Sequence, residues 1–266
     1  MSPLKLYLRY IEISLKSQMQ YKVSFIMVSI GYFFTTIIEF LAVWILFSRF
    51  GSLGIWTLPE VALFYGMTHC AFALSEAWSR GFDIFHRQVK SGDFDRILLR
   101  PRSTVLQIIG QELQLVRIGK LAQGLIILIW GIISLGQPLT GFEIILIIIS
   151  IISGSVLFSG LFVLQATISF WSIESLEIAH TVTNGGLQTT QYPISIYKKW
   201  FRRFFIFVVP LASINYFPLL GILDKAEAAH YPSWIGWVSP LIGIIFFLFS
   251  LKVWNFGVKH YRSTGS

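Results

Sequence analysis

The stretch RGFDIFHRQVKSGDFDRILLRPRS, residues 80–103, is the longest charge-rich interruption in a chain that is otherwise mostly apolar. It carries six of the 21 basic residues: Arg80, Arg87, Lys90, Arg96, Arg100 and Arg102. One interpretation is a cytoplasmic loop that offers a docking surface to a partner protein. The other is a connecting loop whose arginines only fix the orientation of the chain in a membrane, because basic cytoplasmic loops are common.

The second half of this stretch predicts a short amphipathic helix. Asp93 suits the N-cap position, and Pro101 prevents the helix from continuing. Phe94, Ile97 and Leu98 follow the i, i+3, i+4 spacing that places side chains on one helix face. Acidic residues lie towards the start and basic residues towards the end, which suits the helix dipole. The segment therefore predicts a helix with one apolar face that could fill a groove in a partner.

The composition indicates an integral membrane protein. Of the 266 residues, 55% are hydrophobic and 13% are charged, whereas a soluble domain has about 25% charged residues. We expect a single transmembrane domain over residues 1–266 and no separate soluble domain. The single cysteine, Cys70, excludes an internal disulfide.

Apolar stretches long enough to cross a bilayer occur six times after an amphipathic N-terminal segment. Residues 3–20 alternate apolar and charged residues at helical spacing, as in a helix that lies in the membrane interface or leads into the first span. A helix crosses the hydrocarbon core with about 20 residues. The six predicted spans are residues 23–47, 57–79, 104–135, 142–171, 204–223 and 234–254. The predicted fold class is an all-α polytopic membrane protein, with an interfacial helix followed by six transmembrane helices.

The distribution of basic residues predicts the orientation. With a cytoplasmic N-terminus, the segments on that side carry 17 of the 21 basic residues: Lys5, Arg9, Lys16, Lys22, the six of residues 80–103, Lys198, Lys199, Arg202, Arg203, Lys252, Lys259 and Arg262. The outer loops carry only Arg49 and Lys225. This asymmetry predicts that both termini are cytoplasmic. The net charge of +8 therefore reflects membrane topology, and we expect no nucleic-acid partner.

One face of the first predicted span is polar. Ser29, Tyr32, Thr36 and Glu39 follow three- and four-residue spacing along it. A carboxylate inside a membrane is costly and usually faces a protein interior or a water-filled cavity. One interpretation is a translocation path, or a cation or proton site. The other is a packing residue that is protonated or hydrogen-bonded, or one near the outer interface.

The sequence contains no motif for catalysis, nucleotide binding or metal binding. Gly119 and Lys120 superficially resemble the end of a phosphate-binding loop, but Leu121 occupies the position of the required Ser or Thr. No Ser/His/Asp set and no zinc-type Cys/His cluster is evident. We therefore expect a non-enzymatic chain that binds no metal or cofactor. If ATP drives this protein, another chain must bind it.

A second specific stretch is QYPISIYKKWFRRFFIFVVPLASINYFP, residues 191–218, in which a basic cluster leads into a helix kinked by Pro210. Alone it is consistent with a re-entrant or interfacial connector. Together with SGDFDRILLRPRS, residues 91–103, it resembles the membrane subunits of ABC-2 type exporters. The resemblance covers the whole chain, and the most similar group is a bacterial branch near the antibiotic and viologen exporter permeases.

The resemblance implies a multi-pass permease of the bacterial cytoplasmic (inner) membrane that moves an amphiphilic substrate, such as a drug, lipid, glycan or peptide. It implies that two copies of a separate ABC ATPase bind ATP and Mg, and that a second permease subunit, identical or paralogous, completes the transporter. It also implies that a coupling helix after the second span docks on the ATPase. The matching residues are Asp93, Phe94, Arg96, Ile97, Leu98 and Arg100.

One departure and two other functions are left open at this stage. The family often has re-entrant helices between its last two spans, and residues 224–233 are too short for a full pair. An intramembrane enzyme acting on lipids would need His, Asp or Ser side chains around a common pocket. An ion-coupled carrier would rest on Glu39 and an inverted repeat. The sequence shows neither that constellation nor that repeat.

Overall fold

The computed structural model describes residues 3–172, 176–226, 229–232 and 234–262. Within these ranges the chain forms helices and no β-strand, which confirms the predicted all-α class. The α-helices are α1 (Pro3–Gln20), α2 (Lys22–Phe50), α3 (Leu58–Asp83), α4 (His86–Ser91), α5 (Asp93–Leu98), α6 (Thr104–Gln111), α7 (Ile118–Ser134), α8 (Gly141–Ile168), α9 (Leu176–Thr190), α10 (Lys199–Arg203), α11 (Tyr216–Ile222), α12 (Ile235–Val238) and α13 (Pro240–His260). Shorter helical segments are Leu115–Arg117, Ile194–Ile196, Leu211–Ser213 and a π-helix at Phe204–Val208.

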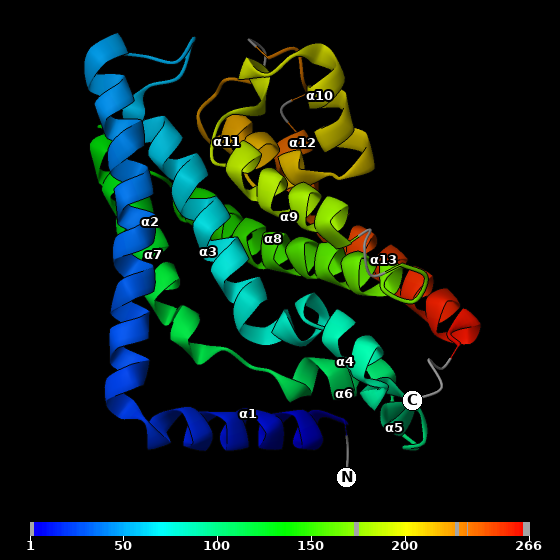
Figure 1. Cartoon of the computed structure of the whole chain (residues 1–266). Helices are drawn as coiled ribbons and strands as arrows, with labels where there is room; N and C mark the ends of the chain where they lie inside the picture. Colours follow the sequence, from blue (N-terminus) through cyan, green and yellow to red (C-terminus); the bar gives the residue numbers. More distant parts are fainter. Residues whose placement is uncertain (1–2, 173–175, 227–228, 233, 263–266) are drawn as a thin grey trace.

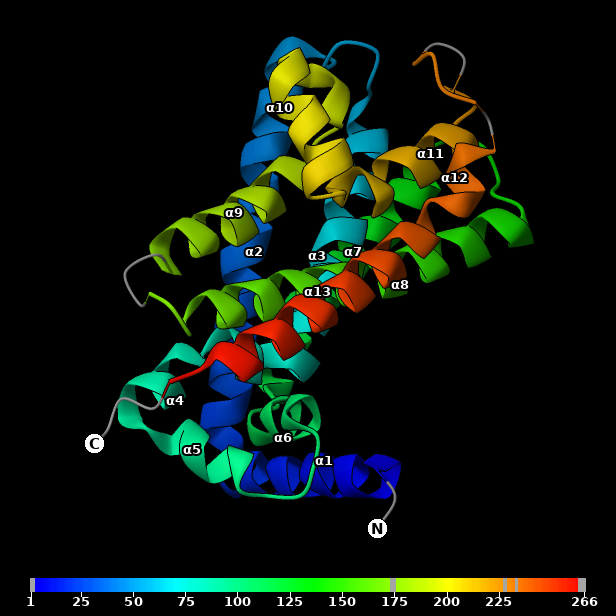
Figure 2. The ribbon, with the colours of Figure 1, turned by 90° about the vertical axis from the view of Figure 1, so that its right-hand side faces the viewer.

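Helix α3 occupies the centre of the bundle (Figures 1 and 2). It packs along both α7 and α8, and α13 runs along α8. These neighbours bury most of the α3 side chains. Helix α2 lies at the edge of the bundle, where it contacts α7 and leaves much of its apolar surface uncovered.

Glycines allow close contacts between the long helices at two points. A Cβ atom at Gly119 of α7 would overlap the carbonyl oxygen of Ser29 in α2. A Cβ atom at Gly243 of α13 would overlap Ser153 in α8. Small residues let helix backbones approach closely, and van der Waals packing of this kind is a main driving force inside a membrane.

Helix α1 lies crosswise at the end of the bundle, as expected for an interfacial helix (Figure 1). Its side chains hold the non-helical break between α6 and α7. Gln18 Nε2 donates a hydrogen bond to the Leu113 carbonyl at 2.7 Å, and the Leu115 amide donates to Gln18 Oε1 at 3.1 Å. The third predicted span, residues 104–135, is therefore two helices separated by a clamped break.

Within the residues that the structure describes, four helical segments are long and apolar enough to cross a membrane: Lys22–Phe50, Leu115–Ser134, Gly141–Ile168 and Ile235–His260. A fifth candidate is broken, because Lys199–Val208 and Leu211–Ile222 meet at 75°, which confirms the predicted kink at Pro210. The predicted count of six is not reached by length and composition alone. Helix α3 falls short because polar side chains such as Glu60, His69 and Glu76 dilute its apolar character.

The structure corrects the predicted position of one basic cluster. Helix α9, which lies between the predicted fourth and fifth spans, carries the chain towards the end of the bundle opposite α1 (Figures 1 and 2). There, Trp56 Nε1 donates a hydrogen bond to Ser195 Oγ at 3.1 Å. The basic residues that follow therefore lie at the far end from α1, not on the α1 side: Lys198, Lys199, Arg202 and Arg203. The positive charges of α1, α4 and α5 remain at the α1 end.

Candidate coupling and translocation sites

The predicted coupling helix exists as α5, and one of its faces is buried in the protein. Phe94 is 0% exposed and Ile97 is nearly as buried. Phe94 belongs to an aromatic cluster, which consists of Phe82, Phe85, Phe94, Phe170, Trp254 and Tyr261. The ring centroids of Phe94 and Phe85 are 4.9 Å apart, and those of Phe94 and Tyr261 are 5.0 Å apart. Edge-to-face contacts of this kind stabilise beyond the area they bury.

The aromatic cluster joins α5 to three other parts of the fold. Phe82 is near the end of α3, Phe170 follows α8, and Trp254 is in α13. Trp254 is fully buried, and its Nε1 donates a hydrogen bond to Thr104 Oγ1 in α6 at 3.1 Å. Burial, followed by the neighbouring Asp95 carboxylate, raises the pKa of the Tyr261 hydroxyl, so the cluster stays uncharged.

The opposite side of α5 is exposed. Leu98 is 40% exposed, and Leu99, just after the helix, is 85% exposed. The sequence predicted one docking face made by Phe94, Ile97 and Leu98. The structure divides this set, because Phe94 and Ile97 pack inward and only Leu98 points outward. The apolar surface available to a partner is therefore Leu98 with Leu99.

The charged residues of the predicted coupling helix surround this apolar tip. Asp93, Arg96 and Arg100 are all exposed. Asp93 lies 3.6 Å from Arg96 and accepts a hydrogen bond from Ser91 Oγ at 2.6 Å. Exposed ion pairs of this kind contribute little stability, so these charges are free to reorganise around a partner.

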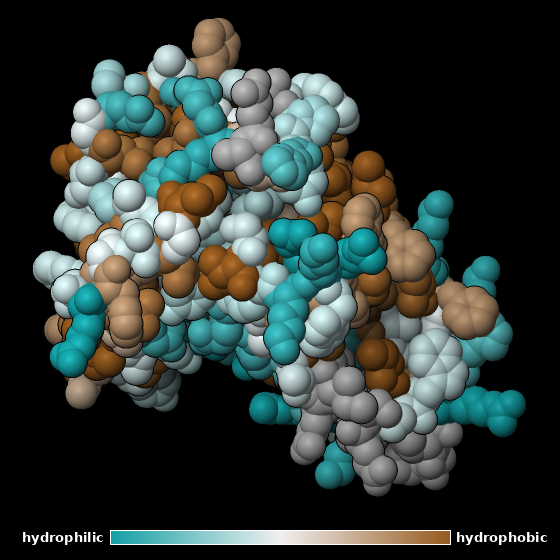
Figure 3. Space-filling view, turned by 90° about the horizontal axis from the view of Figure 1, so that it is seen from above, coloured by the Kyte–Doolittle hydropathy of each residue, from teal (hydrophilic) through white to brown (hydrophobic). Residues whose placement is uncertain are grey.

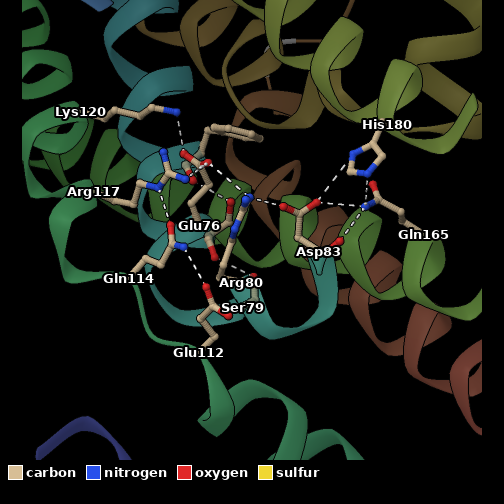
Figure 4. Close-up of polar contacts among 12 residues, drawn as sticks. Glu76, Ser79, Arg80, Asp83, Glu112, Gln114, Arg117, Lys120, Gln165 and His180 are labelled. Carbon is tan, nitrogen blue, oxygen red and sulfur yellow. Dashed lines mark hydrogen bonds and ion pairs between the residues drawn. The ribbon is translucent and has the colours of Figure 1, made fainter. Parts of the chain in front are cut away.

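A second site, which the sequence analysis did not identify, lies on α3 towards the α1 end (Figure 4). Glu76, Arg80 and Asp83 recur at spacings of four and three residues and so share one helix face. The Glu76 side chain is 6% exposed. Its carboxylate lies 2.8 Å from Lys120 Nζ, 3.3 Å from Arg117 Nη2 and 3.9 Å from Arg80 Nη1. A buried carboxylate stays ionised only with such compensation.

The cations that compensate Glu76 connect three helices. Lys120 comes from the first turn of α7, and Arg117 is the last residue of the short helical segment Leu115–Arg117 just before α7. The Arg117 side chain is 7% exposed. Arg117 Nε donates a hydrogen bond to Gln114 Oε1 at 3.0 Å. Its guanidinium also lies 4.3 Å from the ring centroid of Tyr32 in α2, a cation–π contact. Helices α2, α3 and α7 therefore meet at one ionic junction.

Asp83 extends this network to α8 and α9. It pairs with Arg80, and Gln165 Nε2 of α8 donates a hydrogen bond to Asp83 Oδ1 at 2.9 Å. His180 Nδ1 of α9 lies 3.8 Å from the same oxygen. A cavity of about 210 Å³ adjoins these groups, and Phe72 contributes to its wall. Figure 4 shows the carboxylates of Glu76 and Asp83 on either side of Arg80.

Three of the four predicted translocation residues face the bundle. Thr36 is buried, and its hydroxyl donates to the Tyr32 carbonyl at 2.8 Å. Tyr65 of α3 donates from its hydroxyl to the Thr36 carbonyl at 2.7 Å. Ser29 is half-buried where α2 meets α7 at Gly119. These groups bind α2 to its neighbours.

Glu39 behaves differently from the rest of that stripe. It is exposed in this chain, but its carboxylate is near enough to Lys120 of α7 and Tyr65 of α3 to interact with them electrostatically. The four residues therefore differ in exposure: Thr36 is buried, Ser29 and Tyr32 are half-buried, and Glu39 is exposed. Its carboxylate is available to whatever covers α2.

Most of the fold, including α3 and α5, lies within a region that matches a known family. A family model described as ABC-2 family transporter protein matches residues 33–265. The chain belongs to the ABC-2 transporter family. No curated protein and no solved structure matches it significantly. Membership of the ABC-2 family makes the chain a membrane permease and a transport component. The resemblance based on residues 91–103 and 191–218 is thus confirmed, whereas the viologen-exporter branch stays a prediction.

The sequence could have predicted part of the Glu76 junction of this ABC-2 permease. Glu76, Arg80 and Asp83 show helical charge spacing inside an apolar helix, which is costly and therefore informative. Lys120, however, is 44 residues away from Glu76, and spacing alone cannot reveal such a pair. Among the described residues, no group of three or more His, Cys, Asp and Glu could hold a metal ion.

Proposed function

We propose that this ABC-2 permease is the membrane subunit of an ATP-driven exporter of amphiphilic substrates in the bacterial cytoplasmic membrane. Two copies of a separate ATPase bind ATP and Mg, and a second permease subunit, identical or paralogous, completes the transporter. The observation that carries the proposal is α5, which presents an exposed apolar tip while its other face is embedded in the protein core.

Coupling requires that a displacement at the docking surface reaches the membrane helices. The exposed Leu98 and Leu99 lie one helical turn from the buried Phe94. Phe94 contacts Phe85 between α3 and α4, Phe170 after α8, and Trp254 of α13. Trp254 in turn contacts Phe82 of α3. Protein interiors are close-packed and transmit strain. An ATPase that moves the tip of α5 would therefore move α3 and α13 with it, and a floppy loop would not.

The ionic junction around Glu76 gives this movement a second relay. Helix α3 connects to α7 through Lys120 and Arg117, and to α9 through Asp83 and His180. Ion pairs of this kind have discrete partners, so a shift of α3 exchanges partners instead of stretching contacts. We propose that α3 carries the displacement from the α1 end towards the translocation path, where Glu39 of α2 faces the second permease subunit.

We propose six membrane crossings with both termini cytoplasmic, formed by α2, α3, α7, α8, α9 and α13. Helix α3 tolerates its polar residues because α7 and α8 shield it from lipid. Helix α9 replaces residues 204–223 as the fifth crossing. The bent segment from Lys199 to Ile222 is then re-entrant at the outer end, which supplies the element that residues 224–233 are too short to form.

The test distinguishes binding of the ATPase to α5 from transmission of movement between the ATPase and the membrane helices. The chain is reconstituted with its ATPase, and association is measured by pull-down and coupling by substrate-stimulated ATP hydrolysis. Loss of a central apolar anchor commonly costs about 2 kcal/mol or more, so Leu98→Ser with Leu99→Ser should weaken association by roughly 30-fold. Phe94→Ala should leave association largely intact and abolish substrate stimulation. Arg102→Ala is the control and should change neither.

Two results would refute this assignment. Normal association and coupling in the double leucine variant would mean that the ATPase docks elsewhere. Normal substrate stimulation in Phe94→Ala would mean that the aromatic cluster transmits nothing. Transport in liposomes by the purified chain without any ATPase would contradict the exporter mechanism as a whole.

A further inference from the structure

Helix α10 concentrates positive charge at the end of the molecule opposite α1. Lys198, Lys199, Arg202 and Arg203 fall within six consecutive residues. Residues 191–222 contain no acidic residue. Among the parts of the chain that the structure describes, no carboxylate lies within ion-pair distance of any of these four side chains. The cluster is therefore not neutralised by the described fold.

This placement is unusual for a membrane protein. Basic residues gather on the cytoplasmic side, and short segments on the other side are normally depleted in them. The α1 end already carries the basic residues of α1, α4 and α5. Four cations without a described carboxylate partner at the opposite end are therefore unfavourable for membrane insertion. An anionic ligand at that end would compensate their charge.

A pocket lies beside α10, and Arg202 forms part of its wall. Its volume is about 570 Å³, and its walls include Trp56, Tyr216, Tyr231, Ile196 and Arg202. The walls come from residues 53–56 and, much later in the sequence, from residues between 195 and 231. The aromatic and aliphatic lining suits the apolar part of a ligand, and Arg202 supplies planar donors that suit phosphate oxygens.

The other cation next to this pocket is already engaged. Lys225 Nζ lies 2.6 Å from Glu60 Oε1 and 4.6 Å from the ring centroid of Trp56. Trp56 in turn is 1% exposed and donates to Ser195 Oγ. The wall around Trp56 is thus pre-organised by contacts within the chain, and Arg202 remains as the positive group that faces a ligand.

Apolar side chains are exposed beside the same basic cluster. Trp200 is 69% exposed, Phe207 is 79% exposed and Val208 is 60% exposed. Figure 3 looks onto this end of the molecule and shows hydrophilic side chains next to strongly apolar ones. Exposed aromatic residues interleaved with cations are typical of a segment at the level of lipid head groups.

We propose that α10 and the adjoining pocket bind an anionic phospholipid. Arg202 contacts the phosphate of the head group, and the other basic residues of α10 supply the attractive field around it. The acyl chains lie against Trp200 and Phe207. Binding is selective for a negatively charged head group over a zwitterionic one, because the four clustered basic residues attract a head group with net negative charge.

The test is native mass spectrometry of the purified full-length chain in detergent, titrated with phosphatidylglycerol and, separately, with phosphatidylcholine of the same acyl chains. Phosphatidylglycerol should bind at least about tenfold more tightly. Arg202→Gln removes one charge-assisted contact worth about 1.5–3 kcal/mol and should weaken phosphatidylglycerol binding by about tenfold or more. Arg202→Lys should keep part of the selectivity because it keeps the charge.

The matched control is Arg49→Gln, which removes one exposed positive charge at the end of α2, near the same end of the molecule. It should leave both affinities unchanged. Equal binding of the two lipids, parental affinity in Arg202→Gln, or an equal loss in Arg49→Gln would each overturn the proposal. Full displacement of phosphatidylglycerol by an equal concentration of inorganic phosphate would show that only a phosphate is bound. Neither ATPase nor transport enters this measurement, so the proposed exporter function stands or falls separately.

Discussion

Replacing Glu76 with Gln keeps the shape of the side chain and removes the negative charge at the ionic junction. The Glu76 carboxylate is 6% exposed, and its three cationic partners, Lys120, Arg117 and Arg80, have 18%, 7% and 23% of their side-chain surface exposed. Removing one member of a buried ion pair costs about 3–5 kcal/mol, because the remaining charge is left uncompensated. Lys120 and Arg80 can still reach water, so we expect the lower end, about 3 kcal/mol.

For a domain of this size, about 3 kcal/mol corresponds to a decrease in Tm of roughly 6–12 °C. The measurement is thermal unfolding of the purified chain in detergent, followed by tryptophan fluorescence. The matched control is Glu12→Gln, which breaks the fully exposed pair between Glu12 and Lys16 and should not shift Tm measurably. The two variants make the same chemical change in buried and exposed settings.

A double variant tests the cause of the destabilisation. If an uncompensated cation is responsible, adding Lys120→Gln to Glu76→Gln should cost less than the sum of the two single changes. Contacting residues in one ionic network commonly show interaction energies of about 0.5–3 kcal/mol. Strict additivity, or a Glu76→Gln protein as stable as the parent, would refute the view that Glu76 neutralises this junction.

Two further outcomes follow from the contacts of α2. Glu39→Gln should leave the Tm of the isolated chain unchanged, since the side chain is exposed, and should impair transport in the assembled complex; a Tm loss like that of Glu76→Gln would instead mark a packing residue. Gly119→Ala should destabilise by about 1–3 kcal/mol, because a Cβ there overlaps the Ser29 carbonyl. The control is Gly31→Ala in the same helix pair, where no atom lies within 4 Å and the better helix propensity of Ala makes the change neutral or slightly stabilising. Equal Tm shifts in the two glycine variants would contradict close packing at Gly119.

Local properties of the sequence determined the membrane class and most helix positions. The low fraction of charged residues excludes a soluble fold, and the long apolar runs predict α2 and α8 closely, whereas α13 continues to His260, beyond the predicted end at residue 254. The short helix α5 was also predictable, because Pro101 stops a helix that begins near Asp93, although its N-cap is Gly92 and not the predicted Asp93. These signals work within one or two helical turns, so no distant partner is needed to interpret them.

Tertiary structure decided which side of each helix is used. The spacing of Phe94, Ile97 and Leu98 predicts a common face, but only the presence of Phe85 and Trp254 nearby turns Phe94 inward. Likewise, Glu76 finds its counter-charges on α7, far away in sequence. Burial and charge pairing depend on neighbours that the fold supplies, and a single helix pattern does not name them.

Tertiary structure also decided the position of the basic cluster of residues 198–203. Helix α9, which we propose as a crossing, is too polar for hydropathy to mark it as one, since Asn184, Gly185 and several threonines interrupt its apolar residues. The C-terminal end of α9 is stable inside the bundle because the Thr190 carbonyl accepts hydrogen bonds from Thr68 Oγ1 at 3.0 Å and Asn215 Nδ2 at 2.7 Å. A hydropathy scale treats the polar groups of such a helix as exposed to lipid. In the folded protein, polar groups at its end form hydrogen bonds with other helices instead. Without α9, the sequence places Lys198 to Arg203 at the α1 end, whereas the structure places α10 at the opposite end.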